Sequence, residues 1–84
     1  MLFGPEVRVL QEVTMREIEG VFAVTDRLGI SREALVIPLL PRTPGRVRRM
    51  PNGRIEIVVD ATDFPGFVGR LEEALRSAGL VPLP

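Results

Sequence analysis

Apolar and polar side chains alternate most regularly along residues 54–61, Arg-Ile-Glu-Ile-Val-Val-Asp-Ala. Alternation of this kind is typical of a β-strand with one buried face. We therefore expect one set of side chains to point inward, namely Ile55, Ile57 and Val59. The opposite set is expected to point outward, namely Arg54, Glu56, Val58 and Asp60.

The turn sequence Pro51–Gly53 precedes this strand and predicts a β-hairpin. A two-residue Asn-Gly loop would place Arg48 opposite an apolar residue. A three-residue loop, with glycine in the left-handed conformation, would instead pair Arg48 with Glu56 and Val47 with Ile57. We favour the three-residue loop because it pairs unlike charges and matches apolar residues across the strands.

A first helix is predicted after Thr14, which with Glu17 three residues later forms a capping-box pattern. Gly29 supplies the stop signal, and Gly20 inside the helix costs about 1 kcal/mol relative to alanine. The apolar residues recur at helical spacing and are expected to face the core. They are Met15, Ile18, Val21, Phe22 and Leu28.

A second helix is predicted after the last strand, with Thr62 or Asp63 as its cap and Pro65 in its first turn. Gly79 ends it, and Glu72 and Arg76 form an i,i+4 pair in the favourable order. Its apolar face is expected to comprise Phe64, Phe67, Val68, Leu71, Leu75 and Ala78.

Two segments are ambiguous. Residues 6–13 alternate and predict a strand that faces the core with Val7, Val9 and Val13, although a short helix after Pro5 is the rival interpretation. The apolar run 34–40 fits either a buried strand or a short helix. As a strand it must lie at an edge of the sheet or end near Pro38, because proline lacks an amide hydrogen.

These patterns predict one α+β domain over residues 1–84, with 81–84 as an extended tail. The expected order is strand, helix, strand, hairpin, helix. We expect a mainly antiparallel sheet with both helices on one face.

The composition removes most catalytic chemistry. The sequence contains no histidine, cysteine or lysine, and neither of the common glycine-rich phosphate-loop patterns occurs. We therefore expect no cofactor, no zinc or other transition-metal site, and no enzymatic activity. Asp60 and Asp63 flank a predicted strand–helix junction, where carboxylates could form a site. We favour helix capping as their role.

No apolar run reaches membrane-spanning length, and the N-terminus lacks a charged region followed by an apolar one. We expect a soluble, cytoplasmic protein with no membrane partner. All eleven basic residues are arginine and eight residues are proline. This usage indicates the coding bias of a GC-rich genome and predicts a heat-adapted host.

The net charge of zero conceals a local excess of positive charge around the hairpin at residues 42–61. No acidic residue occurs between Glu33 and Glu56, a window with a charge of +5, whereas the rest of the chain carries −5. The candidate binding residues are Arg42, Arg46, Arg48, Arg49 and Arg54.

The stretch Val24–Val36 is similar to part of a helix-turn-helix, with a Leu-Gly-Ile-Ser turn between apolar residues. Followed by a basic hairpin, it resembles a winged-helix domain, which implies that the hairpin is a wing on the DNA backbone. The resemblance covers about thirteen residues, and it departs from the pattern in three ways. Pro38 would cut the recognition helix short, and Arg32 would be the only basic residue on it. The preceding helix is also longer than the short first helix of the motif.

We expect a non-enzymatic protein-interaction or oligomerisation module that uses the basic hairpin as its contact surface. Its expected partner is an acidic protein surface, including that of a second copy in a homo-oligomer. The alternative is a winged-helix-like nucleic-acid-binding domain that uses the hairpin arginines. Nucleic acid is the less favoured partner because no aromatic residue accompanies the arginines for stacking on bases.

Overall fold

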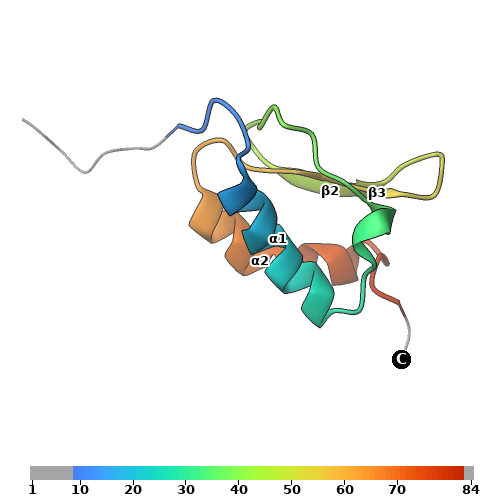
Figure 1. The fold of residues 1–84 in the computed structure, drawn as a ribbon. Coiled ribbons are helices and arrows are strands. Elements are labelled where there is room, and N and C mark those ends of the chain that lie inside the picture. Colours follow the sequence, from blue (N-terminus) through green and yellow to red (C-terminus); the bar gives the residue numbers. More distant parts are fainter. Residues whose placement is uncertain (1–8, 83–84) are drawn as a thin grey trace, which may run out of the picture.

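The computed structural model describes residues 9–82 as two helices and a small sheet (Figure 1). The elements in chain order are α1 (Met15–Arg27), a 3₁₀ turn η1 (Arg32–Ala34), β1 (Leu35–Val36), β2 (Arg46–Arg49), β3 (Ile55–Val58) and α2 (Phe64–Ser77). This confirms the predicted α+β class. Figure 1 shows α1 and α2 side by side, both below the sheet in that view.

The sheet is mixed, so the prediction of a mainly antiparallel sheet was wrong. The strand order is β1-β3-β2, in which β3 runs parallel to β1 and antiparallel to β2. A hairpin makes β2 and β3 antiparallel by its connectivity. The direction of β1 relative to its neighbour depends on which edge of the hairpin it joins, and local alternation carries no information on that choice.

The three-residue turn of the hairpin is confirmed. Val47 lies opposite Ile57 and Arg48 opposite Glu56. The Met50 N–H donates to the Arg54 carbonyl at 2.7 Å, which closes the turn. Gly53 has φ of 85°, the left-handed conformation that glycine adopts without strain.

The connection from β1 to β2 crosses the end of β3, because β3 lies between the two strands that it joins. On the β1 side, the Arg42 N–H donates to the Val59 carbonyl at 3.0 Å and the Ala61 N–H donates to the Arg42 carbonyl at 2.7 Å. Three residues later, Gly45 lies beside Asp60 on the β2 side. The chain passes from one edge of β3 to the other within residues 42–45.

Both helices begin and end as the sequence predicts. The Thr14–Glu17 capping box is present, and the Glu17 carboxylate accepts the Thr14 N–H at 2.8 Å. At α2, the Asp63 carboxylate accepts the Gly66 N–H at 3.1 Å, so Asp63 rather than Thr62 is the cap. Gly29 and Gly79 follow the two helices with positive φ.

The core lies between the helices and β3. It comprises Val13, Val21, Val24, Ile30, Ile55, Ile57, Val59, Phe67, Leu71, Leu75 and Leu80. Gly20, which the sequence marks as a cost to α1, allows the helices to approach closely. A Cβ at this position would lie 3.0 Å from the Phe64 ring of α2.

The predicted burial or exposure of several residues was wrong. Met15 is 63% exposed, because it is the first residue of α1 and precedes the turns that pack on α2. Ala78 is also exposed, just beyond the end of α2. Val58 and Asp60, expected to point into solvent, are both buried at the end of β3 that the connection crosses. Alternation predicts which side of a strand a residue faces and does not reveal which loops cover that side.

The predicted strand at 6–13 does not form over residues 9–13, and Val9 is 61% exposed. Residues 6–8 of that segment lie outside the described part of the chain. Val13 does reach the core, and its N–H donates to the Leu39 carbonyl at 2.8 Å. In the run 34–40, η1 leads directly into the two-residue edge strand β1, which ends before Pro38 as that proline requires.

Replacing Gly45 with alanine is expected to destabilise the protein. A Cβ there would lie 2.6 Å from the Asp60 backbone nitrogen and 2.7 Å from the Val58 carbonyl oxygen, and backbone atoms cannot rotate away. We expect a loss of about 1–3 kcal/mol in the free energy of unfolding, measured by denaturant titration. The matched control is Gly69→Ala on α2, where the added Cβ would meet nothing within 4 Å. We expect this control to stabilise the protein by about 0.5–1 kcal/mol, because alanine favours a helix more than glycine does. Equal stability of the two variants would contradict this account of the crossing.

Candidate functional site

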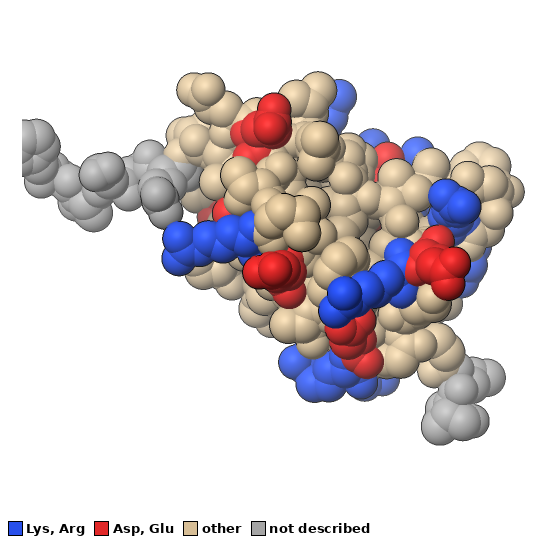
Figure 2. Space-filling view, in the orientation of Figure 1, with Lys and Arg blue, Asp and Glu red and all other residues tan. Residues whose placement is uncertain are grey.

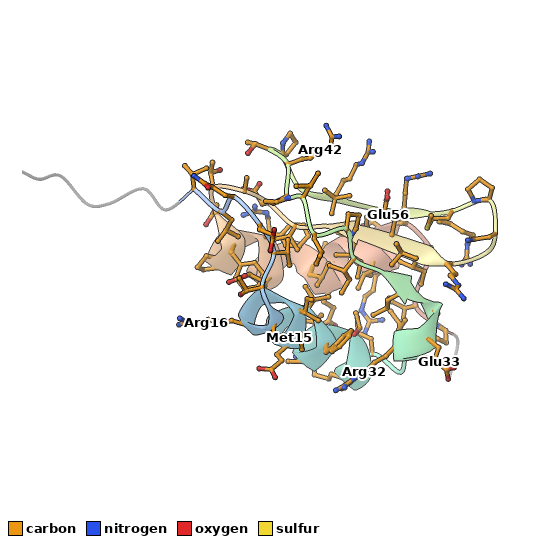
Figure 3. All side chains as sticks on the ribbon, turned by 45° about the horizontal axis from the view of Figure 1, so that its top comes forward. Met15, Arg16, Arg32, Glu33, Arg42 and Glu56 are labelled. Atoms are coloured by element: carbon orange, nitrogen blue, oxygen red, sulfur yellow. The ribbon has the colours of Figure 1, made fainter. Side chains whose placement is uncertain are left out.

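The sheet divides the five hairpin arginines between its two faces. Arg46 and Arg48 lie opposite Val58 and Glu56, so they share the face that points away from the helices. We call this the outer face. Alternation places Arg54 on it as well, and Figure 3 shows Arg42 and Glu56 together on the sheet side of the molecule.

Arg49 lies opposite Ile55, on the face that packs against the helices. Its guanidinium donates to the Gly53 carbonyl at 3.2 Å, which ties it to the turn. The five candidate arginines are all exposed, but only four can contact one surface together. A linear charge count could not reveal this division, because it ignores the pleat of the strand.

One outer-face arginine has an acidic partner. Arg48 pairs with Glu56 at 2.7 Å across the strands, as the favoured register predicts. None of the acidic residues within 9–82 forms a salt bridge with Arg42, Arg46 or Arg54. These three guanidinium groups therefore keep their charge available for a ligand.

Elsewhere on the described surface most arginines have an acidic partner, and on the face drawn in Figure 2 basic and acidic groups are interspersed. Glu72 of α2 accepts hydrogen bonds from Arg27 of α1 at 2.8 Å and from Arg76 at 3.1 Å, and both lower the pKa of its carboxyl. Arg70 lies 3.8 Å from Asp63. The excess positive charge of the described surface is thus concentrated at the hairpin.

Arg32 is the only basic residue in the segment that resembles a recognition helix, and its side chain is held by contacts within the molecule. Its guanidinium donates to Asp26 at 2.7 and 3.2 Å and lies 4.4 Å from the centre of the Phe22 ring. The hydrogen bond from Arg32 lowers the pKa of Asp26. The segment after Gly29 forms a 3₁₀ turn and a strand, so the recognition helix implied by the resemblance is not formed.

The Asp60 carboxylate joins the crossing connection to the start of α2. One oxygen accepts the Thr62 and Asp63 N–H groups at 2.8 and 2.9 Å and the Thr62 hydroxyl at 3.0 Å. The other accepts the Gly45 N–H at 3.2 Å. Asp60 is only 6% exposed. Its carboxylate is engaged in these structural contacts, as Asp63 is in capping.

These contacts lower the pKa of Asp60. The Thr62 amide hydrogen bond contributes most, the Gly45 and Asp63 amides add to it, and burial opposes them by raising the pKa. Sequence reasoning treated Asp60 as a cap and missed its link to Gly45. The available signal was an aspartate at a strand end with Thr62 two residues later, which is typical of a side chain that closes its own turn.

A groove of about 190 Å³ lies between β2 and α2. Val47, Phe67, Leu71 and Ala74 give it an apolar floor, and the exposed Arg46 and Arg70 also line it. The sequence gives no sign of this groove, because its lining comes from two elements that only the tertiary fold brings together.

No family model, curated protein or solved structure matches this chain. Within residues 9–82, no helix is long and apolar enough to cross a membrane.

Replacing Asp60 with asparagine is expected to cost about 1–3 kcal/mol in the free energy of unfolding, because an amide NH₂ would then face either the Gly45 N–H or the N–H groups of Thr62 and Asp63. The control is Asp63→Asn, since asparagine caps helices as well as aspartate does. We expect the control to lie within about 0.5 kcal/mol of the parent protein. Denaturant titration at neutral pH measures both effects.

The same pair tests the pH dependence. The pKa of Asp60 is lower in the folded than in the unfolded protein, so its stabilisation is present above about pH 4 and is lost as the pH falls below that value. We expect Asp60→Asn to lose less stability on acidification than the parent protein. Some loss should persist because hydrogen bonds from Thr14 also lower the pKa of Glu17. An unchanged acid profile in Asp60→Asn would contradict this assignment.

Proposed function

We propose that this chain is a non-enzymatic interaction module that binds an acidic protein surface through the outer-face arginines. The observation that carries the proposal is a contrast in pairing. Of the five described arginines outside the hairpin, Arg27, Arg32, Arg70 and Arg76 have an acidic partner, and Arg16 of α1 is the exception. Three of the four on the outer face have none among the described residues, namely Arg42, Arg46 and Arg54.

Exposed apolar residues next to this charge favour a protein partner. Leu39 and Leu40 are 54% and 69% exposed, and they immediately precede Pro41 and Arg42 in the connection that crosses β3. Apolar side chains bordered by charged ones are typical of protein interaction surfaces. Guanidinium groups form paired hydrogen bonds with carboxylates, which gives such a surface its preference for acidic partners.

Nucleic acid is the weaker candidate. The described phenylalanines lie on α1 and α2, namely Phe22, Phe64 and Phe67, so none belongs to the hairpin as a stacking platform for bases. The segment 31–36 offers no helix for a DNA groove. Arginine contacts with phosphates alone would give binding without sequence preference.

Self-association is part of the same proposal, because the remainder of the chain carries the compensating negative charge. It would not use the β2 edges of two copies. A two-fold antiparallel pairing centred on Val47 places Arg46 opposite Arg48 of the other copy, and like charges directly opposite destabilise such a pair. The exposed Leu39 and Leu40 are the better contact in a homo-oligomer.

Binding to an acidic probe is the first test. We expect a fluorescein-labelled nonapeptide of alternating glutamate and serine to bind at low ionic strength, with an affinity that falls as salt is added. Fluorescence anisotropy measures this. Arg46→Gln should weaken binding several-fold, because it removes a guanidinium that has no acidic partner among the described residues.

The control for charge alone is Arg16→Gln, which removes the same charge from the exposed surface of α1 (Figure 3). We expect its affinity to stay within about twofold of the parent value. Equal losses in the two variants, or no binding at low salt, would contradict the proposal. Tighter binding of a 20-base-pair duplex through the same arginine would instead support the nucleic-acid alternative.

Sedimentation velocity over a range of protein concentrations tests self-association. We expect the sedimentation coefficient to rise with concentration, and Leu40→Asp to abolish the rise by placing a charge in the apolar contact. Ala23→Asp is the control, because Ala23 is exposed on α1. A parent protein that stays monomeric at the highest concentration would contradict the homo-oligomer.

A further inference from the structure

The sheet has two edges, and they differ in what they can bind. β1 has only two residues and lies between η1 and Pro38, which leaves little backbone for pairing. β2 has four residues, and β3 covers only one of its sides. An unpaired strand of this kind presents N–H and C=O groups that another chain can use.

The hairpin register identifies those groups. Met50 and Arg54 form a hydrogen-bonded pair at the turn, and such pairs alternate along an antiparallel ladder. The next pair that exchanges hydrogen bonds is therefore Arg48 with Glu56. The N–H and C=O groups of Val47 and Arg49 must then point away from β3, toward the open side of the sheet.

Each side of that open edge has its own chemistry. Toward the helices, the Val47 side chain lies in the groove of about 190 Å³ over Phe67, Leu71 and Ala74. Toward the outer face, Arg46 and Arg48 stand on either side of Val47. An added strand that pairs with Val47 would place one residue over the apolar groove and its two neighbours beside the arginines.

We propose that the free edge of β2 binds an extended segment of an acidic partner protein as a fourth strand. The segment carries an apolar residue, seated opposite Val47, between two acidic residues. Main-chain hydrogen bonds to Val47 and Arg49 supply the attachment, and the groove and the arginines select the alternating pattern. This inference rests on the proposed function and adds how the acidic partner is held.

The arginines also explain why the edge takes a partner segment and not its own copy. Charged side chains on an edge strand prevent pairing between identical strands. The same charges attract a strand with acidic residues at the matching positions. One feature thus excludes self-pairing and selects the partner.

The test uses three nonapeptides of alternating glutamate and valine on the full chain. In the bound register, the valine N–H groups point toward β2 and the glutamate N–H groups point away. We expect the unmodified peptide to bind, and N-methylation of the valines to weaken binding by at least tenfold. The peptide begins and ends with glutamate and so has four valines. N-methylation of the four glutamates after the first adds the same number of methyl groups to the other edge, and we expect its affinity to stay within about threefold.

Amide hydrogen exchange of the complex gives an independent readout. We expect the Val47 and Arg49 amides to exchange at least tenfold more slowly when the unmodified peptide is bound, whereas the Arg48 amide, already paired with β3, changes little. A charge contact through the arginine side chains would not produce this alternation.

The outcomes separate this inference from the proposed function. If the three peptides bind equally and no amide of β2 gains protection, strand addition is overturned while charge-based binding stands. If none of the three binds at low salt, both are overturned. In Ala74→Trp a large ring fills the groove. If the Val47 and Arg49 amides then lose their protection from hydrogen exchange, the apolar residue of the peptide binds in the groove.

Discussion

A buried carboxylate holds together the point where three segments of the chain meet. Asp60 stands where the connection from β1 crosses the end of β3, and it accepts hydrogen bonds from Gly45 on one side and from Thr62 and Asp63 on the other. A buried carboxylate without such partners would destabilise the protein. Because its partners come from the connection and from the start of α2, Asp60 fixes the position of β2 relative to that helix.

This position determines what β2 exposes. The close approach of Gly45 to Asp60 and Val58 starts β2 at the edge of the sheet beside α2. The groove floored by Val47 and Leu71 lies along that edge. The buried contact and the candidate binding surface are therefore parts of one arrangement, although Asp60 itself takes no part in binding.

Much of this could be predicted from local sequence. Helix caps, helix ends and the hairpin register depend on residues a few positions apart. Local sequence therefore predicted the Thr14 cap and the Arg48–Glu56 pair, and it offered Asp63 as one of two caps for α2. The parallel pairing of β1, the burial of Asp60 and the groove over Leu71 depend on contacts between distant segments. Alternation and charge counts do not encode which loop covers a strand or which face holds an arginine.

For the same reason, the face of the sheet on which each arginine lies predicts the binding partner better than the number of arginines does. Counted along the chain, five positive charges suggest a general attraction for any polyanion. In the sheet, Arg49 turns toward the helices and Arg48 is paired with Glu56, so the outer face holds fewer available charges in a defined spacing. A flexible polyanion gains little from such spacing, whereas an extended peptide repeats its side chains with the period of the strand it joins. The geometry of β2 therefore favours a strand-like acidic partner over a diffuse one.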